Sequence, residues 1–520
     1  MRAGLFAILM GIAALTFAPA RGEGADEAAS PARTETIAPR PADRDWREDQ
    51  VEALAIALFD APSHGLPALD STAERLLDRS VSLAGRGELA SHAFRRYAGW
   101  LRFGLIDSET RQPVRLDADE SFEIEVALDR ALSGEGIAPV LDDLLPTVPD
   151  YRILQAEMLR LMALHPIWPQ IEDGPSLVEG EQGRRVDQLR ARLSAVGLYN
   201  EVWRPGEAFD ARLATALVRF QGQANLSPSG ELDRPTLRQL NITPQARMDQ
   251  LRLNLEQRRW QERDPGHRYI RVNLADFQLE AWEGGRIAQR HDVMVGRQVS
   301  STPEFTEEMQ YLVLNPWWGL PSGLATGRFQ SFRRNPGLAR QLGFRIYDAS
   351  GQQISVYDID WSRWGRGWPY RLSQPPGGDN PMGEVKFIFP NSHNVYLHDT
   401  NHREQFTSTR RDFSAACVRV RDPLRLAAWV LQYQDGWDAA EIDRVTAGNT
   451  PTVVWLDERI PVHINYWTAV GDPDGRVRYL YDLYSRDGAL IRALAATLQA
   501  EAEAGLPVMA SRAGGAAPTH

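Results

Sequence analysis

Residues 395–423 read VYLHDTNHREQFTSTRRDFSAACVRVRDP and combine a strand-like run, a polar loop and the only cysteine of the sequence. Residues 394–398 have the composition of a β-strand that ends at His398, and strand alternation predicts that Tyr396 and His398 share one face. A polar loop follows. Cys417 comes nineteen residues after His398, directly behind the small residues 414–416.

The residue types in this stretch predict thiol chemistry. A thiol needs a nearby base to supply thiolate, and imidazole is the usual base in proteins, so His398 and Cys417 are the candidate pair. Small residues before a nucleophile let the backbone approach closely, so the amides of Ala416 and Cys417 are candidates for stabilising an oxyanion. Ser414 is interpreted as a brace of the turn. Taken alone, Cys417 fits equally well a small buried apolar residue.

The surrounding sequence, residues 268–485, predicts a mostly-β domain. Apolar residues alternate in Ile270, Val272 and Leu274, and further strands are expected at 311–315, 386–389, 394–398, 452–456 and 462–468. Within this stretch, only residues 423–434 have a clear helical pattern. Residues 322–380 are rich in Arg, Trp, Gly and Pro without strong periodicity, which is typical of an inserted lid or binding loop.

The first half of the chain is predicted to be helical. Residues 46–170 have apolar residues at helical spacing and no recognisable chemistry, which favours a scaffold domain. Residues 181–241 form a compact three-helix unit, whose first helix has Val186 and Leu189 on one face and ends at Gly197.

Composition and the N-terminus indicate an exported protein. Residues 1–20 combine Arg2, an apolar run and a small-x-small site, which predicts a signal peptide; an uncleaved anchor is the alternative. Residues 21–45 are interpreted as a disordered linker and 505–520 as a disordered tail. The net charge of −11 over 520 residues disfavours nucleic acid as a partner.

Two residue counts bear on the chemistry. With one cysteine, the chain makes no internal disulfide, so Cys417 is not a structural crosslink. Of the 58 basic residues only Lys386 is a lysine, which we interpret as the bias of a GC-rich genome.

Residues 181–241 resemble peptidoglycan-binding domain 1, through the segments LRARLSAVGLY and ALVRFQGQANLSPSGELDRPTLRQLN. The alternative is a plain three-helix bundle that docks on its neighbour. The order His398, then SAACVR at 414–419, resembles the catalytic motif of YkuD-type L,D-transpeptidases. The sequence is also similar to the YcbB-like branch of that family, in the segments HDT, PMGEVKF and PVHINYWTA.

The resemblance implies a multidomain α+β protein: a helical scaffold, a peptidoglycan-binding module and a catalytic β-domain with an inserted lid. It further implies a periplasmic enzyme that needs no metal or organic cofactor. Cys417 would attack a tetrapeptide donor stem and form a thioester, which an amine of a neighbouring stem resolves to a 3-3 cross-link. His398 would hold the thiolate and protonate the leaving amine. Arg419 would bind a stem carboxylate or fix the loop. Carbapenems would acylate Cys417.

Two positions depart from the family motif. Ala415 stands where relatives have His or Ser, and Ala416 stands where they have Gly, which removes freedom for positive φ and puts the oxyanion hole in doubt. Asp399 is predicted to point away from the face of His398. Competing bases are His393, His402 and His463. Five tryptophans are candidates either for a substrate cleft or for core packing: Trp317, Trp318, Trp361, Trp364 and Trp368.

Alternative functions remain at this point. A papain-like endopeptidase normally has cysteine before histidine, the reverse of the order here. A non-catalytic wall-binding scaffold would keep residues 181–241 while the β-domain decays. The same acyl-enzyme could also be resolved by water, by a D-amino acid or by a protein amine.

Overall fold

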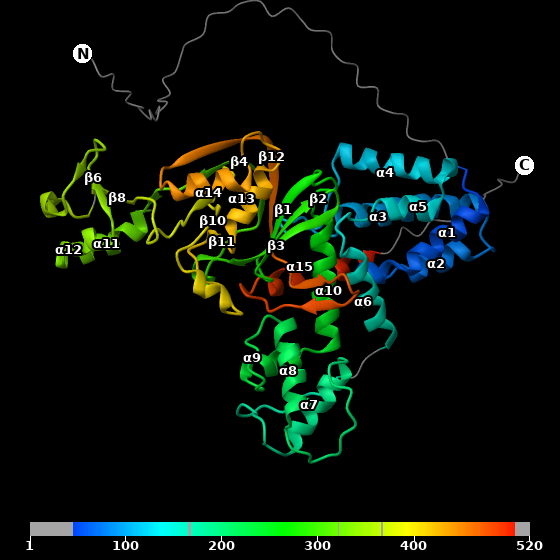
Figure 1. Cartoon of the computed structure of the whole chain (residues 1–520). Helices are drawn as coiled ribbons and strands as arrows, with labels where there is room; N and C mark the ends of the chain where they lie inside the picture. The colour runs from blue at the N-terminus through cyan, green and yellow to red at the C-terminus, as the bar shows by residue number, and fades with distance from the viewer. Residues whose placement is uncertain (1–44, 165–167, 321, 366–367, 505–520) are drawn as a thin grey trace, which may run out of the picture. The chain divides into compact units, whose positions relative to one another are not determined.

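A computed structural model describes residues 45–164, 168–320, 322–365 and 368–504 (Figure 1). The predicted signal peptide at 1–20, all but the last residue of the linker at 21–45, and the tail at 505–520 lie outside these described residues. Among the described helices, none combines the length and apolar character needed to span a membrane.

The first region is a helical domain with its own hydrophobic core. Leu54, Phe94 and Leu128 are fully buried in this core, and Asp117 caps the fourth helix by accepting from the backbone N–H of Asp119 and Glu120. The helices are α1 Glu48–Phe59, α2 Asp70–Leu77, α3 Leu83–Phe103, α4 Ala118–Arg130, α5 Ile137–Asp143 and α6 Tyr151–Leu164.

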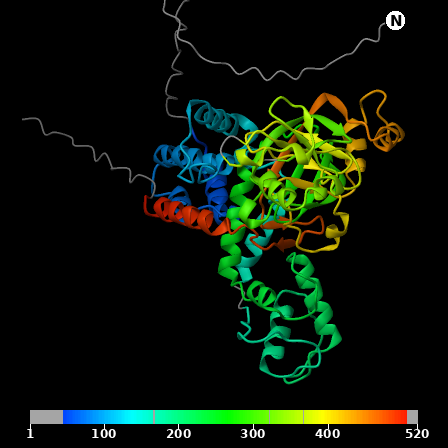
Figure 2. The ribbon, with the colours of Figure 1, turned by 90° about the vertical axis from the view of Figure 1, so that its left-hand side faces the viewer.

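The second region is the predicted three-helix unit (Figure 2). It consists of α7 Arg184–Ala195, α8 Ala211–Gln223 and α9 Arg234–Leu240, around a core that includes Val186, Leu189 and Leu217. Gly197 has φ of 73°, the left-handed conformation expected just after a helix end.

A long helix that the sequence analysis left unassigned, α10 Pro244–Arg259, follows this unit. It is buried on nearly all sides. Its Arg258 guanidinium makes a bidentate ion pair with Asp150 at the start of α6, and Asn254 Nδ2 donates to Thr468 Oγ1 at 3.0 Å. The helix therefore joins the helical domain to the chain segment that follows the β-barrel.

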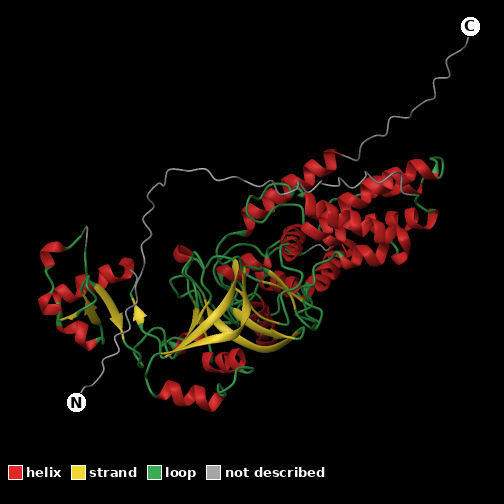
Figure 3. Ribbon diagram, turned by 90° about the horizontal axis from the view of Figure 1, so that it is seen from above, coloured by secondary structure: helices red, strands yellow, loops and turns green. Residues whose placement is uncertain are grey.

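Eight of the described strands close into a barrel in the order β1-β12-β4-β9-β10-β11-β3-β2 (Figure 3). Most neighbours are antiparallel, but β1 with β12 and β10 with β11 are parallel. The strands are β1 Arg268–Asn273, β2 Gln278–Glu283, β3 Arg286–Met294, β4 Phe305–Leu314, β9 Val385–Ile388, β10 Leu397–His398, β11 Val418–Val420 and β12 Thr452–Asn465. The expected strands at 452–456 and 462–468 are one long strand with a bulge between Trp455 and Ile460.

Alternation along these strands fills the barrel interior with apolar side chains. Val272, Leu312 and Phe387 are among the buried residues of this core, and Leu397, Val418 and Val420 complete it on the side of β10 and β11. Because successive side chains point to opposite faces, the residues between these positions face outward. This decides which face of the barrel carries the polar side chains of residues 395–423.

The insertion is a small folded unit, contrary to the expectation of an irregular segment. It contains α11 Ser322–Arg334 and α12 Gly337–Gln341 with a four-stranded sheet in the order β5-β8-β6-β7. Its strands are β5 Trp318–Gly319, β6 Arg345–Tyr347, β7 Gln353–Ile354 and β8 Arg371–Gln374. Phe329 and Phe332 are buried at its centre, and the many aromatic residues supply a core that periodicity alone did not reveal.

The prediction that residues 423–434 are the only clearly helical segment within 268–485 is wrong, because that stretch contains α14 Ala439–Ala447 as well as α13 Pro423–Leu431. A hairpin of β13 Ala469–Gly471 and β14 Val477–Tyr479 follows, and α15 Asp487–Ala504 comes after this stretch. Leu490 and Leu494 of α15 pack into the core of the first helical domain.

Candidate active site

Three neighbouring strands bring the candidate residues together on the outer face of the barrel. In the parallel pair β10 and β11, His398 lies opposite Arg419, and in the antiparallel pair β9 and β10, Lys386 lies opposite His398. Leu397 and Val418 point into the core, so Lys386, His398 and Arg419 form a row across the outside. Cys417 directly precedes β11 at one end of this row.

The Cys417 thiol is half-buried, with Sγ 3.8 Å from the carbonyl oxygen of Asn394. Burial raises the pKa of the thiol, because the charged form loses hydration. Tyr396, Lys386 and Arg419 act in the opposite direction and lower the pKa, the tyrosine by hydrogen bonding and the two cations by their charge. The pKa of the thiol therefore depends on two opposite effects, the loss of hydration and the charge of two nearby cations.

His398 is buried, with only 2% of its surface exposed, and its Nδ1 has no hydrogen-bond partner among the described residues. Burial, together with the nearby charge of Arg419, lowers its pKa to about 3. The imidazole is thus neutral at physiological pH. This differs from the expectation that a protonated His398 holds a resting thiolate: the neutral imidazole is a base that can accept the thiol proton during attack.

The turn before the nucleophile is held by Ser414. Its hydroxyl donates to the carbonyl of Cys417, its backbone N–H donates to Val295, and its carbonyl accepts from the backbone N–H of Arg297. Ser414 is almost completely buried. These contacts fit a bracing role and leave the hydroxyl no path to react.

Ala416 adopts φ of 93°, a conformation that favours glycine. The turn therefore keeps the backbone geometry of a glycine position with an alanine in place. Gly296 of the neighbouring chain segment packs closely against this turn: a Cβ at Gly296 would clash with the Ser300 carbonyl oxygen and would lie 3.0 Å from the Ala416 Cα. The Thr302 hydroxyl also donates to the Ala416 carbonyl at 2.7 Å.

Arg419 is the second cation of the row. Its Nε is buried without a hydrogen-bond partner, and burial lowers the pKa of its guanidinium. A desolvated guanidinium without a carboxylate is suited to bind one from outside, since arginine recognises carboxylates through paired N–H donors.

The other candidate residues lie elsewhere. Asp399 accepts from the backbone N–H of Glu384 and pairs with Arg403, away from the imidazole of His398. His393 is exposed beside Phe305, and His402 is paired with Glu404 at 3.4 Å. His463 is buried on β12, with Nδ1 3.1 Å from the hydroxyl of Thr306.

The tryptophans of the insertion serve mainly its own core. Trp361, Trp364 and Trp368 surround the buried Phe329, while Trp318 packs against Phe344. Trp317 is more exposed and lies next to Arg345. Trp364 and Trp368 also line a cavity of about 560 Å³ in the insertion.

Sequence reasoning missed Lys386 as a site residue and gave Tyr396 no role. The Lys386 Nζ lies 3.5 Å from the centroid of the Tyr396 ring, and both side chains act on the Cys417 thiol. One signal was available: Lys386 is the only lysine of the chain. Strand pairing, which sequence alone does not give, was needed to place it beside His398.

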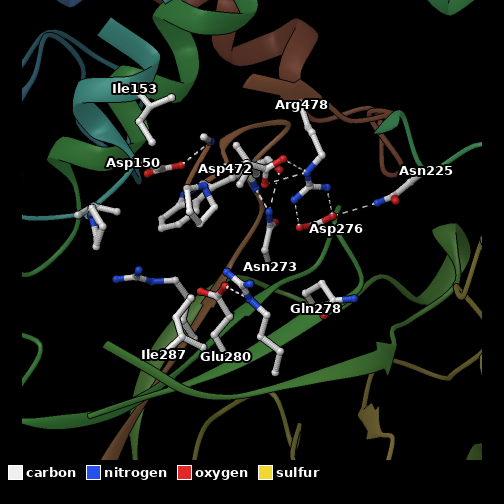
Figure 4. Close-up of a pocket in the computed structure, with 18 of the residues that line it drawn as sticks. Asp150, Ile153, Asn225, Asn273, Asp276, Gln278, Glu280, Ile287, Asp472 and Arg478 are labelled. Carbon is white, nitrogen blue, oxygen red and sulfur yellow. Dashed lines mark hydrogen bonds and ion pairs between the residues drawn. The ribbon is translucent and has the colours of Figure 1, made fainter. Parts of the chain in front are cut away.

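A different outer face of the barrel, on β1, β2 and β3, lines a cavity of about 440 Å³ (Figure 4). Arg478 projects into this region and makes ion pairs with Asp276 and Asp472, while Asn225 donates to Asp276. Arg411, from the loop that precedes Cys417, pairs with Asp292 on the same face. These contacts anchor the loop to the barrel. Across the described residues, no group of three or more His, Cys, Asp or Glu side chains is arranged to hold a metal ion.

The barrel brings a cysteine, a histidine and two cations together on one outer face, an arrangement that is suited to thiol chemistry. Comparison with known families is more specific: residues 267–464 match the L,D-transpeptidase catalytic domain, described for the YkuD family. For these residues the predicted family is confirmed, and the matches along the chain also confirm the predicted multidomain α+β fold. Residues 43–158 match a scaffold domain, and residues 182–240 match the family described as "Putative peptidoglycan binding domain".

Similar proteins carry related descriptions. A Haemophilus influenzae protein described as "Putative L,D-transpeptidase" is 29% identical over 254 residues, which cover 49% of this chain and 50% of that protein. The chain thus matches about half the length of this curated relative. Solved L,D-transpeptidases from Stackebrandtia nassauensis (12% identity, 57% of this chain and 97% of that chain, TM-score 0.21) and Xylanimonas cellulosilytica (13%, 57% and 100%, TM-score 0.18) are also similar.

Proposed function

We propose that the chain is a periplasmic L,D-transpeptidase of the YcbB-like branch, which forms 3-3 cross-links in peptidoglycan through Cys417. The observation that carries this proposal is the strand register that aligns His398 with Arg419 next to Cys417, within a domain of the L,D-transpeptidase family. The module at residues 181–241 would hold the enzyme on its polymeric substrate.

The reaction follows from the protonation states of the site. Cys417 Sγ attacks the carbonyl carbon of the third residue of a tetrapeptide stem, and its proton passes to the neutral His398. The C–N bond breaks, the terminal D-alanine leaves with that proton on its amine, and a thioester remains. An amine of a second stem then attacks the thioester, restores the thiol and completes the cross-link.

The surrounding groups fit the steps of this reaction. Arg419, whose Nε has no hydrogen-bond partner, would bind a carboxylate of the donor stem. The backbone N–H groups of residues 416 and 417 would face the developing oxyanion, and Ser414 keeps their turn in place. A carbapenem, whose strained amide offers a similar carbonyl, would acylate the same sulfur.

Mass spectrometry of product mixtures tests this function. The full chain is incubated with disaccharide tetrapeptides, with the Cys417→Ala variant as control. Cross-linked dimer and released D-alanine are expected from the wild type alone. Tripeptide without dimer would instead assign an L,D-carboxypeptidase, exchange of the last residue for added D-amino acid would assign an exchange enzyme, and no product at all would favour a non-catalytic scaffold.

The insertion at residues 322–380 is proposed to be the lid of this site. Its two ends lie together, because Asn380 Nδ2 donates to the Pro316 carbonyl at 2.9 Å, and it has its own aromatic core. A lid would exclude water, which competes with the acceptor amine for the thioester.

Deleting residues 322–380 and joining the ends with a short Gly-Ser linker tests the lid. We expect the product ratio to shift from cross-linked dimer towards hydrolysed tripeptide, while Cys417 still reacts with a small thiol reagent. A folded deletion variant with an unchanged ratio would show that the insertion does not act as a lid.

A further inference from the structure

Lys386 is exceptional in the composition of this chain. The other 57 of its 58 basic residues are arginines, so whatever bias removed lysine elsewhere did not remove it here. Lysine differs from arginine in presenting a compact ammonium on a flexible stem, whereas guanidinium is a wide planar fork. A position that keeps lysine against such a bias is one where the shape of the cation matters.

The structure gives the shape constraint. Lys386 is half-buried on β9, directly opposite His398 of β10, and its Nζ lies 3.5 Å from the centroid of the Tyr396 ring. A compact cation can approach a ring face this closely, and the attraction strengthens where water is excluded. Among the described residues, no carboxylate pairs with Lys386, so the ring is its main fixed contact.

The groups that face Lys386 and Cys417 are all basic, neutral or phenolic. They are Tyr396 and His398 from the β10 segment, Arg419 from β11, and Arg297, whose charge acts on Arg419 from the segment after β3. In this cluster the charge of Lys386 lowers the pKa of the thiol and also lowers the pKa of the imidazole. Both effects favour a thiolate beside an unprotonated histidine.

We propose that Lys386 is a positioning residue whose ammonium, clamped over Tyr396, supplies the fixed charge that stabilises the Cys417 thiolate and keeps His398 free to accept the thiol proton. This inference rests on the proposed role of Cys417 as nucleophile. It assigns the counter-charge of the thiolate to Lys386 and Arg419, which do not change protonation during the reaction. His398 then serves only to move the proton.

The pH dependence of Cys417 alkylation by iodoacetamide tests this role, because the chain has no other thiol. Lys386→Met should raise the midpoint of the alkylation profile by about 1–2 pH units, the usual effect of one adjacent charge, and Lys386→Arg should restore part of the shift. Arg286→Met, which removes an exposed charge at the far end of β3, is the matched control and should leave the midpoint unchanged. An unchanged midpoint in folded Lys386→Met would overturn the proposal.

Chemical modification of the wild-type protein provides a test that avoids folding of a variant. Acetylation of Lys386 removes its charge, whereas reductive methylation keeps it. Only the acetylated protein should show the raised midpoint, and the Lys386→Arg protein, treated identically, controls for the N-terminal amine. Equal midpoints after both modifications would also overturn the proposal. Alkylation uses no wall substrate. A raised alkylation midpoint in a protein that forms no cross-links would therefore refute the proposed function but not the role of Lys386.

Discussion

Two outer faces of the same barrel differ in how their polar groups are satisfied. On the face of β1 to β3, carboxylates and guanidiniums are matched, as in Arg478 with Asp276 and Asp472 (Figure 4). On the face of β9 to β11, His398 Nδ1 and Arg419 Nε are buried without a hydrogen-bond partner in the described part of the chain, and the backbone at Ala416 is strained. The contacts of the first face stabilise the fold, whereas the unpaired groups of the second face are what the proposed substrate site requires.

Arg271 on β1 differs from the matched pairs in a way that supports the distinction. Arg271 Nε is also buried without a hydrogen bond, but its guanidinium lies among the rings of Tyr269, Trp282 and Trp467. Aromatic faces satisfy that cation, whereas Arg419 has no such ring contact among the described residues. Substitutions on the two faces should therefore have different consequences: loss of chemistry on one, loss of stability on the other.

The largest effect is expected for Cys417→Ala on the unmatched face. It should abolish both dimer formation and covalent labelling by a carbapenem, since no other thiol exists in the chain. Unfolding should be almost unchanged, because one sulfur is small beside a total stability of about 5–15 kcal/mol. Intact-protein mass spectrometry measures the labelling; full labelling of the variant would refute the assignment.

His398→Ala should slow acylation by about 10²–10⁴-fold, the usual contribution of general acid–base catalysis. Without the imidazole, reaction depends on free thiolate, and because burial raises the pKa of Cys417, the rate should recover only at alkaline pH. The wild type should keep an unprotonated His398 down to about pH 3, where its pKa lies. Stopped-flow acylation measures both profiles. His402→Ala, at the exposed histidine, is the control; a defect there instead of at His398 would show that the wrong histidine was chosen.

On the matched face, Arg478→Met should destabilise the fold by about 3 kcal/mol, because Asp276 and Asp472 would lose their shared cation in a mostly buried setting. The alkylation midpoint of Cys417 should not move. Urea unfolding measures the first effect. Arg459→Met, which breaks an exposed pair with Glu308, should cost less than about 1 kcal/mol. Equal losses from both variants would remove the distinction between buried and exposed pairs.

Ala416→Gly should give the smallest effect, a stabilisation of about 0.5–1 kcal/mol. Relief of the strain at φ of 93° is partly offset by the greater freedom of glycine in the unfolded chain. Acylation should be at least as fast as in the wild type, since the turn already has glycine-like geometry. Destabilisation measured by urea unfolding would show that the methyl group makes contacts that outweigh the strain.

The sequence by itself determined the elements with clear local signals. Period-two alternation gave most strands of the barrel, helical spacing gave the α7 to α9 unit, and the order from His398 to Arg419 gave the family. It failed where the signal is not periodic: the insertion around Phe329 has an aromatic core on short elements, and α10 is buried on almost every side. α10 buries mostly polar and charged side chains, such as Asn254, Glu256 and Arg258, so it has no apolar stripe with a helical period.

Only the tertiary structure decided the charge state of the site. Burial decides whether the His398 imidazole and the Cys417 thiol are desolvated, and strand register decides which cations lie beside them. Neither burial nor register can be read from the order of the residues alone. The pairing of β9 with β10 and of β10 with β11 places Lys386 and Arg419 on either side of His398, residues that are 33 positions apart in sequence (386 to 419). A motif names the nucleophile and the base, but the protonation states from which they start are a property of the fold.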